Sequence, residues 1–122
     1  RVLEEIQHGR LGLFLEAAST ALASDDGHLI AALLTTEETP RRGIFVDLAV
    51  APEFQRRGLA TYLLHLGFRA LLALGYASAS LWVSESNAPA RALYAKEGFR
   101  PYLASTLIAY TRAEPPQPHT SR

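Results

Sequence analysis

The fold is decided by two adjacent segments, GIFVDLAVAP at residues 43–52 and QRRGLA at residues 55–60. The first predicts a strand, because β-branched and aromatic residues dominate it and Pro52 ends it. The second predicts a basic turn that opens a long apolar helix. The unpaired N–H groups at such a helix start suit a phosphate group, and the two arginines indicate more than one phosphate. The sequence therefore predicts a phosphorylated cofactor at a strand–turn–helix junction.

The details of the turn exclude two common phosphate-binding motifs. A P-loop needs a lysine followed by serine or threonine, and a dinucleotide fingerprint needs three glycines, whereas this turn has only Gly58. The pattern Gln55-x-x-Gly58-x-Ala60 resembles the acyl-CoA pyrophosphate signature of the GCN5-related N-acetyltransferase (GNAT) family. Its context adds to the resemblance, because residues 48–52 are similar to the family's fourth strand and residues 81–99 to its fifth strand and fourth helix.

The resemblance covers residues 18–112 and implies an α/β (α+β) GNAT fold, with a central mixed sheet, splayed parallel strands and flanking helices. The residue pattern agrees, because strands expected at 43–50 and 77–84 enclose a helix at 57–74, which implies a parallel crossover. We expect a GNAT acetyltransferase domain at 1–112 and a disordered, proline-rich tail at 113–122. The family's first strand and first helix are expected to be missing from this chain.

Two other regions carry structural expectations. An Asp25-Asp26-Gly27 turn predicts a hairpin, and residues 37–42, with Pro40, predict a polar surface loop. The helix at 57–74 carries apolar residues at helical spacing, which we expect to face the sheet: Leu59, Leu63, Leu66, Ala70 and Leu74. Further apolar residues widen that face, namely Leu64, Phe68, Leu71 and Leu72. They indicate either a thick core or the interface of a homodimer.

The composition of the chain limits which classes of partner and metal site are expected. Twelve basic and twelve acidic side chains cancel, so neither nucleic acid nor a membrane is the expected partner. The absence of cysteine removes thiol nucleophiles and cysteine metal ligands, and the four histidines lack the spacing of a metal site or a triad, so no metal is expected. Apolar runs are too short to cross a bilayer and no signal peptide is visible, which makes the cytoplasm the default location.

The resemblance implies acetyl-CoA as cosubstrate. Its pantetheine arm would pair like a strand with the backbone of Leu48 and Val50, and the amide of Val50 or Ala49 would face the thioester oxygen. The pyrophosphate would lie on amides of the helix start, where Gly58 allows close approach. The expected cofactor-binding residues are Leu48, Ala49, Val50, Gln55, Arg56, Arg57, Gly58, Leu59, Ala60, Thr61, Asn87 and Tyr94.

Tyr94 is the general acid that the resemblance implies, since the matching tyrosine of the family protonates the departing CoA thiolate. A phenol with a pKa of about 10 and a thiol with one of about 8.5 are compatible with that transfer. A tyrosine packed under the sheet is the alternative. Asn87 is expected to cap the helix and contact the pantetheine arm. The candidate general bases are Glu85 and Asp47, and the alternative is a water chain to bulk solvent, with Glu85 a solvated loop charge. Some relatives carry a glutamate where this chain has Trp82, so that role does not transfer.

These expectations combine into a function. The resemblance implies an enzyme, an N-acetyltransferase (acyltransferase) that transfers the acetyl group of acetyl-CoA to a primary amine by direct attack in a ternary complex. The amine belongs to a small molecule or a peptide. The apolar loop at residues 10–16, with Phe14, is expected either to line the acceptor pocket or to fill the core. The alternative is a catalytically silent acyl-CoA-binding regulatory module of a larger polypeptide.

Overall fold

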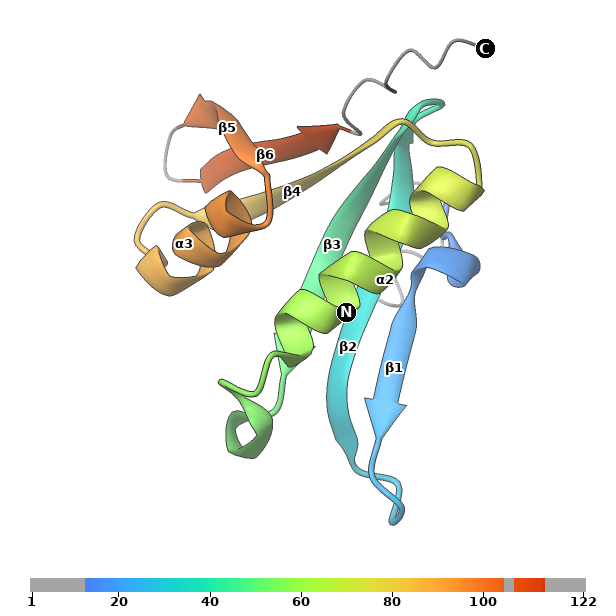
Figure 1. Cartoon of the computed structure of the whole chain (residues 1–122), viewed down its shortest axis with the longest axis vertical. Coiled ribbons are helices and arrows are strands. Elements are labelled where there is room, and N and C mark those ends of the chain that lie inside the picture. The colour runs from blue at the N-terminus through green and yellow to red at the C-terminus, as the bar shows by residue number, and fades with distance from the viewer. Residues whose placement is uncertain (1–12, 105–106, 114–122) are drawn as a thin grey trace, which may run out of the picture.

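The computed structural model describes residues 13–104 and 107–113, which form a mixed six-stranded sheet in the order β1-β2-β3-β4-β6-β5 (Figure 1). The strands are β1 (Thr20–Ala23), β2 (Leu29–Thr39), β3 (Arg42–Val50), β4 (Ser78–Ser84), β5 (Arg100–Ala104) and β6 (Leu107–Ala113). The helices are α2 (Leu59–Ala73) and α3 (Ala88–Lys96), with short 3-10 turns η1 (Glu16–Ala18) and η2 (Pro52–Phe54). The predicted fold class, a mixed sheet flanked by helices, is confirmed.

The parallel strands β3 and β4 pair over only part of their length. Their ladder joins residues 42–45 to residues 78–81, and β3 then continues to Val50 while β4 continues to Ser84. Figure 1 shows the two strands side by side at one end and well separated at the other. The splayed pair that the sequence predicted is therefore present, and all other neighbouring strands of the sheet are antiparallel.

A β-bulge lies where the two strands separate. Phe45 is opposite Thr35 of β2 and Asp47 is opposite Leu34, so Val46 is an extra residue without a partner on β2. An extra residue bends its strand and increases the local twist. The bulge therefore accounts for the turning of β3 away from β4 immediately after their last pair.

Helix α2 covers one face of the sheet, lying across β2 and β3 (Figure 1). Gly67 allows the close approach, because a Cβ there would lie 2.6 Å from a Leu33 methyl carbon. The predicted buried face of the helix was partly wrong: Leu74 is 48% exposed, whereas Leu64 and Phe68 are only 1% and 4% exposed. These side chains belong to the core, as the thick-core interpretation requires, and not to a subunit interface.

The predicted surface loop at residues 37–42 is mostly strand. β2 runs to Thr39 and β3 begins at Arg42. The polar side chains of this stretch have partners far along the chain: the Tyr76 hydroxyl donates to Glu37 and the Ser80 hydroxyl donates to Glu38, each at 2.5 Å. Contacts that span such long separations in sequence are invisible to a local pattern, which explains why the prediction failed.

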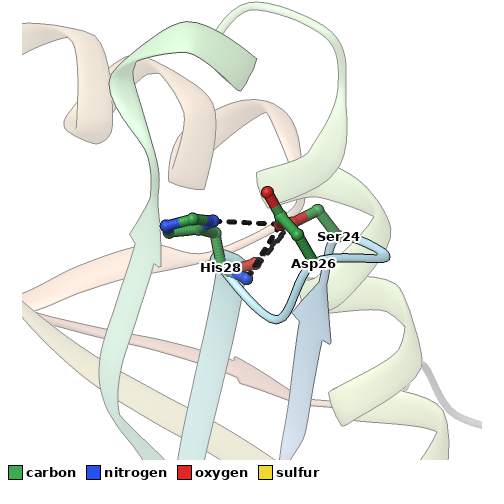
Figure 2. Close-up of polar contacts among 3 residues, drawn as sticks. All are labelled: Ser24, Asp26 and His28. Carbon is green, nitrogen blue, oxygen red and sulfur yellow. Dashed lines mark hydrogen bonds and ion pairs between the residues drawn. The ribbon is translucent and has the colours of Figure 1, made fainter.

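The predicted hairpin between β1 and β2 is confirmed, and its turn is held by three side chains (Figure 2). The Ser24 hydroxyl donates to the Asp26 carboxylate, and His28 Nδ1 lies 2.9 Å from that carboxylate. Gly27 has a φ of +91°, which a left-handed turn residue requires. The His28 imidazole contacts the aspartate, and the Ser24 hydroxyl contacts the aspartate and the His28 backbone, so the set stabilises a turn and does not form a serine nucleophile.

Some expectations fall on residues 1–12 and 114–122, which lie outside the described residues. They are the missing first strand and helix and the disordered tail, and the domain boundary at residue 112 stays a prediction. Among the helices of the described residues, none combines the length and the apolar character that crossing a membrane requires.

Candidate functional site

A cavity of about 220 Å³ lies where β3 and β4 diverge. Its lining comes from both strands, from α2, and from the start and middle of α3: Phe45, Val46, Asp47, Leu48, Leu64, Leu81, Trp82, Val83, Ser84, Asn87 and Tyr94. Below it, Phe45 and Leu81 are 5% and 3% exposed and belong to the core. The cavity therefore has a packed floor and opens between two strands that no longer bond to each other.

One edge of β3 faces this cavity with its backbone groups unused by a neighbouring strand. The Ala51 N–H donates to the Ile30 carbonyl of β2 at 2.8 Å, and the Leu48–Leu33 and Val50–Ala31 pairs are in register. Because backbone groups alternate in direction along an antiparallel strand, those of Ala49 and Ala51 point toward β2. Those of Leu48 and Val50 point toward the side from which β4 has departed. An extended ligand could pair with them as a strand would.

A tight turn connects this open edge to α2. The side-chain amide of Gln55 donates to the Val50 carbonyl at 3.0 Å, which ties the turn to the end of β3. Arg56 and Gly58 both have left-handed φ angles, +64° and +83°. The first hydrogen bond across the helix start runs from the Tyr62 N–H to the Gly58 carbonyl. The preceding amides of α2 therefore have no intrahelical partner and form a site for an anion.

The same turn carries positive charge. Arg56 and Arg57 are exposed, and the Arg57 guanidinium lies 5.2 Å from the centre of the Phe54 ring. The N-terminus of a helix adds a partial positive charge to that of the side chains. A ligand with a phosphate or pyrophosphate group matches this end of the site.

Tyr94 of α3 lines the cavity and is half-buried. Its ring centre lies 6.0 Å from that of Phe99, which in turn lies 6.4 Å from that of Phe45, so a row of aromatic rings positions it. Desolvation by burial raises the pKa of Tyr94 above its ordinary value of 10.0. The phenol is therefore protonated at neutral pH and can act as a proton donor.

Of the other predicted polar residues, Asn87 and Asp47 line the cavity and Glu85 does not. Asn87 lines the cavity, and its side-chain oxygen accepts from the Ala90 N–H at 3.2 Å, so its predicted role as helix cap is confirmed. Glu85 is exposed and not part of the cavity lining, and its backbone carbonyl accepts from Arg91 at 3.1 Å. Asp47 is part of the lining.

Comparison with known protein families shows to which family the chain belongs. The sequence matches the Acetyltransferase (GNAT) family over residues 3–99. The chain belongs to the GNAT family. No curated protein sequence matches it significantly.

Solved structures with the GNAT fold include the ribosomal-protein-S18-alanine N-acetyltransferase of Escherichia coli, at 28% identity and a TM-score of 0.68, with 82% of this chain and 68% of that chain covered. The PaiA N-acetyltransferase of Thermoplasma acidophilum, in complex with coenzyme A, has 17% identity and a TM-score of 0.69, covering 79% and 61%. A GNAT acetyltransferase of Elizabethkingia anophelis with acetyl-CoA bound has 16% identity and a TM-score of 0.71, covering 93% and 82%. The chain thus spans about three fifths of the length of the Thermoplasma protein.

Sequence reasoning missed some features of this GNAT site. The bulge at Val46 has no local signature, and Trp82 was considered only as a departure from the family pattern. Strand alternation around Trp82, between buried Leu81 and Val83, could have placed its ring on the opposite face.

The apolar loop expected at the acceptor pocket is described from residue 13 onward. Leu15 is 9% exposed and belongs to the core, and Phe14 forms a bridge to Thr36 on β2. Neither residue belongs to the cavity lining. Leu15 thus fills the core, whereas Leu13 is 63% exposed and Phe14 is not part of the core cluster.

The histidines within the described residues have structural partners. His65 Nε2 lies 2.5 Å from the Glu97 carboxylate, and His28 contacts Asp26 in the hairpin turn. Within the described residues, no three histidine, aspartate or glutamate side chains are grouped to hold a metal ion.

Proposed function

We propose that this GNAT chain is an acetyl-CoA-dependent N-acetyltransferase that acetylates a primary amine of a small molecule or a peptide. The observation that carries the proposal is the Gln55–Val50 hydrogen bond, which joins the open edge of β3 to the anion-binding start of α2. The backbone edge that can pair with an extended ligand is thus continuous with the helix-start amides that can bind phosphate. Two structural neighbours, those of Thermoplasma and Elizabethkingia, contain coenzyme A and acetyl-CoA and so support an acyl-CoA ligand for this shape of site.

The residues present fit such a ligand. The pantetheine arm pairs with the backbone of Leu48 and Val50, and the Asn87 side chain contacts it from α3. The pyrophosphate lies on amides from Arg57 to Thr61 with both arginines beside it. A Cβ built at Gly58 meets no atom within 4 Å, so the space above this turn is open to a phosphate group.

Two groups at the site have separate roles in the proposed acetyl transfer. The amine attacks the carbonyl carbon of the thioester, and the Val50 N–H stabilises the charge that develops on the carbonyl oxygen. The carbon–sulfur bond breaks, and the Tyr94 hydroxyl gives its proton to the departing thiolate. That hydroxyl is protonated at neutral pH, which is the state that a general acid needs, and burial raises its pKa further above 10.0.

Two carboxylates compete for the role of general base. Asp47 lines the cavity, whereas Glu85 lies outside the lining at the exposed turn before α3. We keep both carboxylates as candidates, with a water chain to bulk solvent as the alternative. Asp47→Asn and Glu85→Gln separate them: loss of the true base lowers kcat and changes its dependence on pH, while the other variant keeps the profile of the unmodified chain.

The test combines binding and turnover. Calorimetry with acetyl-CoA measures the ligand, and mass spectrometry after incubation with a panel of amines measures transfer. Tyr94→Phe keeps the ring and serves as the matched control. Failure to bind acetyl-CoA would overturn the proposal, whereas binding without hydrolysis or transfer to any amine would identify the silent acyl-CoA-binding module instead.

A further inference from the structure

Asp47 lies on the face of the sheet opposite α2. Its neighbour Leu48 packs against the core and is paired with Leu33, which is fully buried. Since successive side chains of a strand point to opposite faces, Asp47 and its partner Leu34 point away from α2. Asp47 is exposed, and among the described residues no ion pair or hydrogen bond engages its carboxylate.

Trp82 lies on the same face, across the divergence of the strands. It stands between Leu81 and Val83, which are 3% and 6% exposed and belong to the core on the α2 side. The indole therefore projects to the opposite face, where Trp82 is 46% exposed. Both Asp47 and Trp82 line the same cavity, one from each strand.

The open ring of Trp82 differs from three other aromatic rings in the described part of the chain. Arginine guanidinium groups lie over the rings of Phe54, Phe68 and Tyr102, at 5.2, 4.3 and 5.9 Å from their centres. No such cation covers Trp82 within the described residues. Tryptophan is the strongest of the aromatic side chains in binding a cation over its face.

From these observations we infer that Trp82 and Asp47 form an acceptor subsite that selects an amine carrying a second positive charge. The inference rests on the proposed acetyltransferase function and adds the substrate class. A linear aliphatic diamine has the required chemistry: one amino group reacts at the thioester, and the other, as ammonium, lies between the indole face and the Asp47 carboxylate. With Asp47 in this role, the reacting amine gives its proton to Glu85 or to water.

A monoamine with the same carbon chain provides the matched comparison. Diaminobutane differs from butylamine by a second amino group, which adds a positive charge and doubles the number of reactive amines, so the preference must exceed twofold. If the subsite acts as inferred, diaminobutane has the higher kcat/KM, by about fivefold to tenfold, as a partly desolvated cation–π contact supports.

Trp82 itself provides a direct binding signal, because it is the single tryptophan of the chain. In the presence of coenzyme A, diaminobutane should change the indole emission in a saturable way, and at lower concentration than butylamine. A chain that binds coenzyme A but responds equally to both amines, or to neither, would overturn the inference and leave the proposed function standing. A chain that does not bind coenzyme A would overturn both.

Substitutions of Trp82 then test whether its ring causes the preference for diaminobutane over butylamine. Trp82→Leu keeps an apolar side chain without the π face, and the ratio of kcat/KM for diaminobutane to that for butylamine should fall toward twofold. Trp82→Phe should retain part of the preference. Tyr102→Leu, at an exposed aromatic ring that is not part of the cavity lining, is the control and should keep the full ratio. A preference above twofold that survives in Trp82→Leu would overturn the assignment.

Discussion

Phe45 of β3 and Leu81 of β4 form the last pair of the parallel ladder, and their side chains remain in the core. One residue later the bulge at Val46 turns β3 away, and the cavity begins. The floor of the site is thus the edge of the hydrophobic core. Substitutions that alter the depth of the cavity will also alter stability, so predictions about function require variants that leave this pair intact.

The first prediction tests the phosphate site at Gly58. Gly58→Ala places a methyl group at the turn, where an acyl-CoA pyrophosphate is proposed to approach. Because Gly58 has a φ of +83°, alanine also adds backbone strain of about 1–2 kcal/mol. We expect a large loss of acetyl-CoA affinity, measured by calorimetry, together with a modest loss of stability, measured by urea unfolding.

Gly75→Ala separates the two effects. Gly75 has a φ of +99° and, like Gly58, has no atom within 4 Å of a built Cβ, so the strain is comparable. It follows α2 at the opposite end of that helix from Gly58. Equal losses of affinity in the two variants would mean that strain, and not proximity to phosphate, explains the effect, and the pyrophosphate assignment would be wrong.

The second prediction concerns the proton of Tyr94. Tyr94→Phe should lower kcat by about 100-fold, at the lower end for loss of a general acid, with little change in acetyl-CoA affinity. Because burial raises the Tyr94 pKa above 10.0, an acid of this kind loses its proton only at still higher pH. The unmodified chain should therefore show no descending limb below about pH 10 that depends on this residue. A full rate in Tyr94→Phe would leave the ring with a packing role alone.

The third prediction concerns acid stability of the hairpin turn. The hydrogen bond from Ser24, followed by those from His28, lowers the pKa of Asp26 below its ordinary value of 3.8. A depressed pKa in the folded state stabilises the protein above pH 3.8, and this contribution is lost as the pH falls through the lowered value. Asp26→Asn should therefore show a smaller drop in Tm between neutral pH and pH about 3 than the unmodified chain does.

The neighbouring Asp25 offers the control for this prediction. It is also exposed and lies in the same turn, but no hydrogen bond holds its side chain among the described residues. Asp25→Asn should keep the acid sensitivity of the unmodified chain. Identical pH profiles for the two variants would show that the Ser24–Asp26–His28 contacts contribute nothing measurable.

The sequence predicted those features that local chemistry controls. The helix cap at Asn87 and the turn at Gly27 each depend on residues within one or two turns of the chain, and the parallel crossover from β3 to β4 follows from the order strand, helix, strand. The extension of β2 through Glu37 and Glu38 depends instead on Tyr76 and Ser80, about forty positions away. Local patterns carry no information on such partners.

The candidate site likewise combines features that local sequence controls with features that depend on long-range strand pairing. The family resemblance implied that Gly58 and Tyr94 share one site, and in the structure Tyr94 lines the cavity and Gly58 lies in the turn that follows β3. The shared face of Asp47 and Trp82 was not predicted, because it depends on the register of two strands and on a bulge. The buried face of α2 was misjudged because leucines occupy most of its circumference, so periodicity alone did not select Leu64 over Leu74.

The last prediction uses two adjacent threonines of β2 that share residue type, strand and burial. Thr35 and Thr36 are both 0% exposed. The Thr35 hydroxyl donates to the buried Ala18 carbonyl at 2.6 Å, whereas the Thr36 hydroxyl has no hydrogen-bond partner among the described residues. Valine replaces either hydroxyl with a methyl group of similar shape and keeps the β-branched side chain that a strand favours.

The two substitutions should act in opposite directions. Thr35→Val leaves the buried Ala18 carbonyl without the hydroxyl that donates to it. This change should lower the free energy of unfolding by about 1–3 kcal/mol. Thr36→Val removes a buried group that has lost its water without gaining a partner, so stability should stay level or rise by about 1 kcal/mol. Urea unfolding of both variants measures the difference directly. If Thr36→Val costs as much as Thr35→Val, the Thr36 hydroxyl has a partner in solution, and its apparent isolation is not a property of the folded protein.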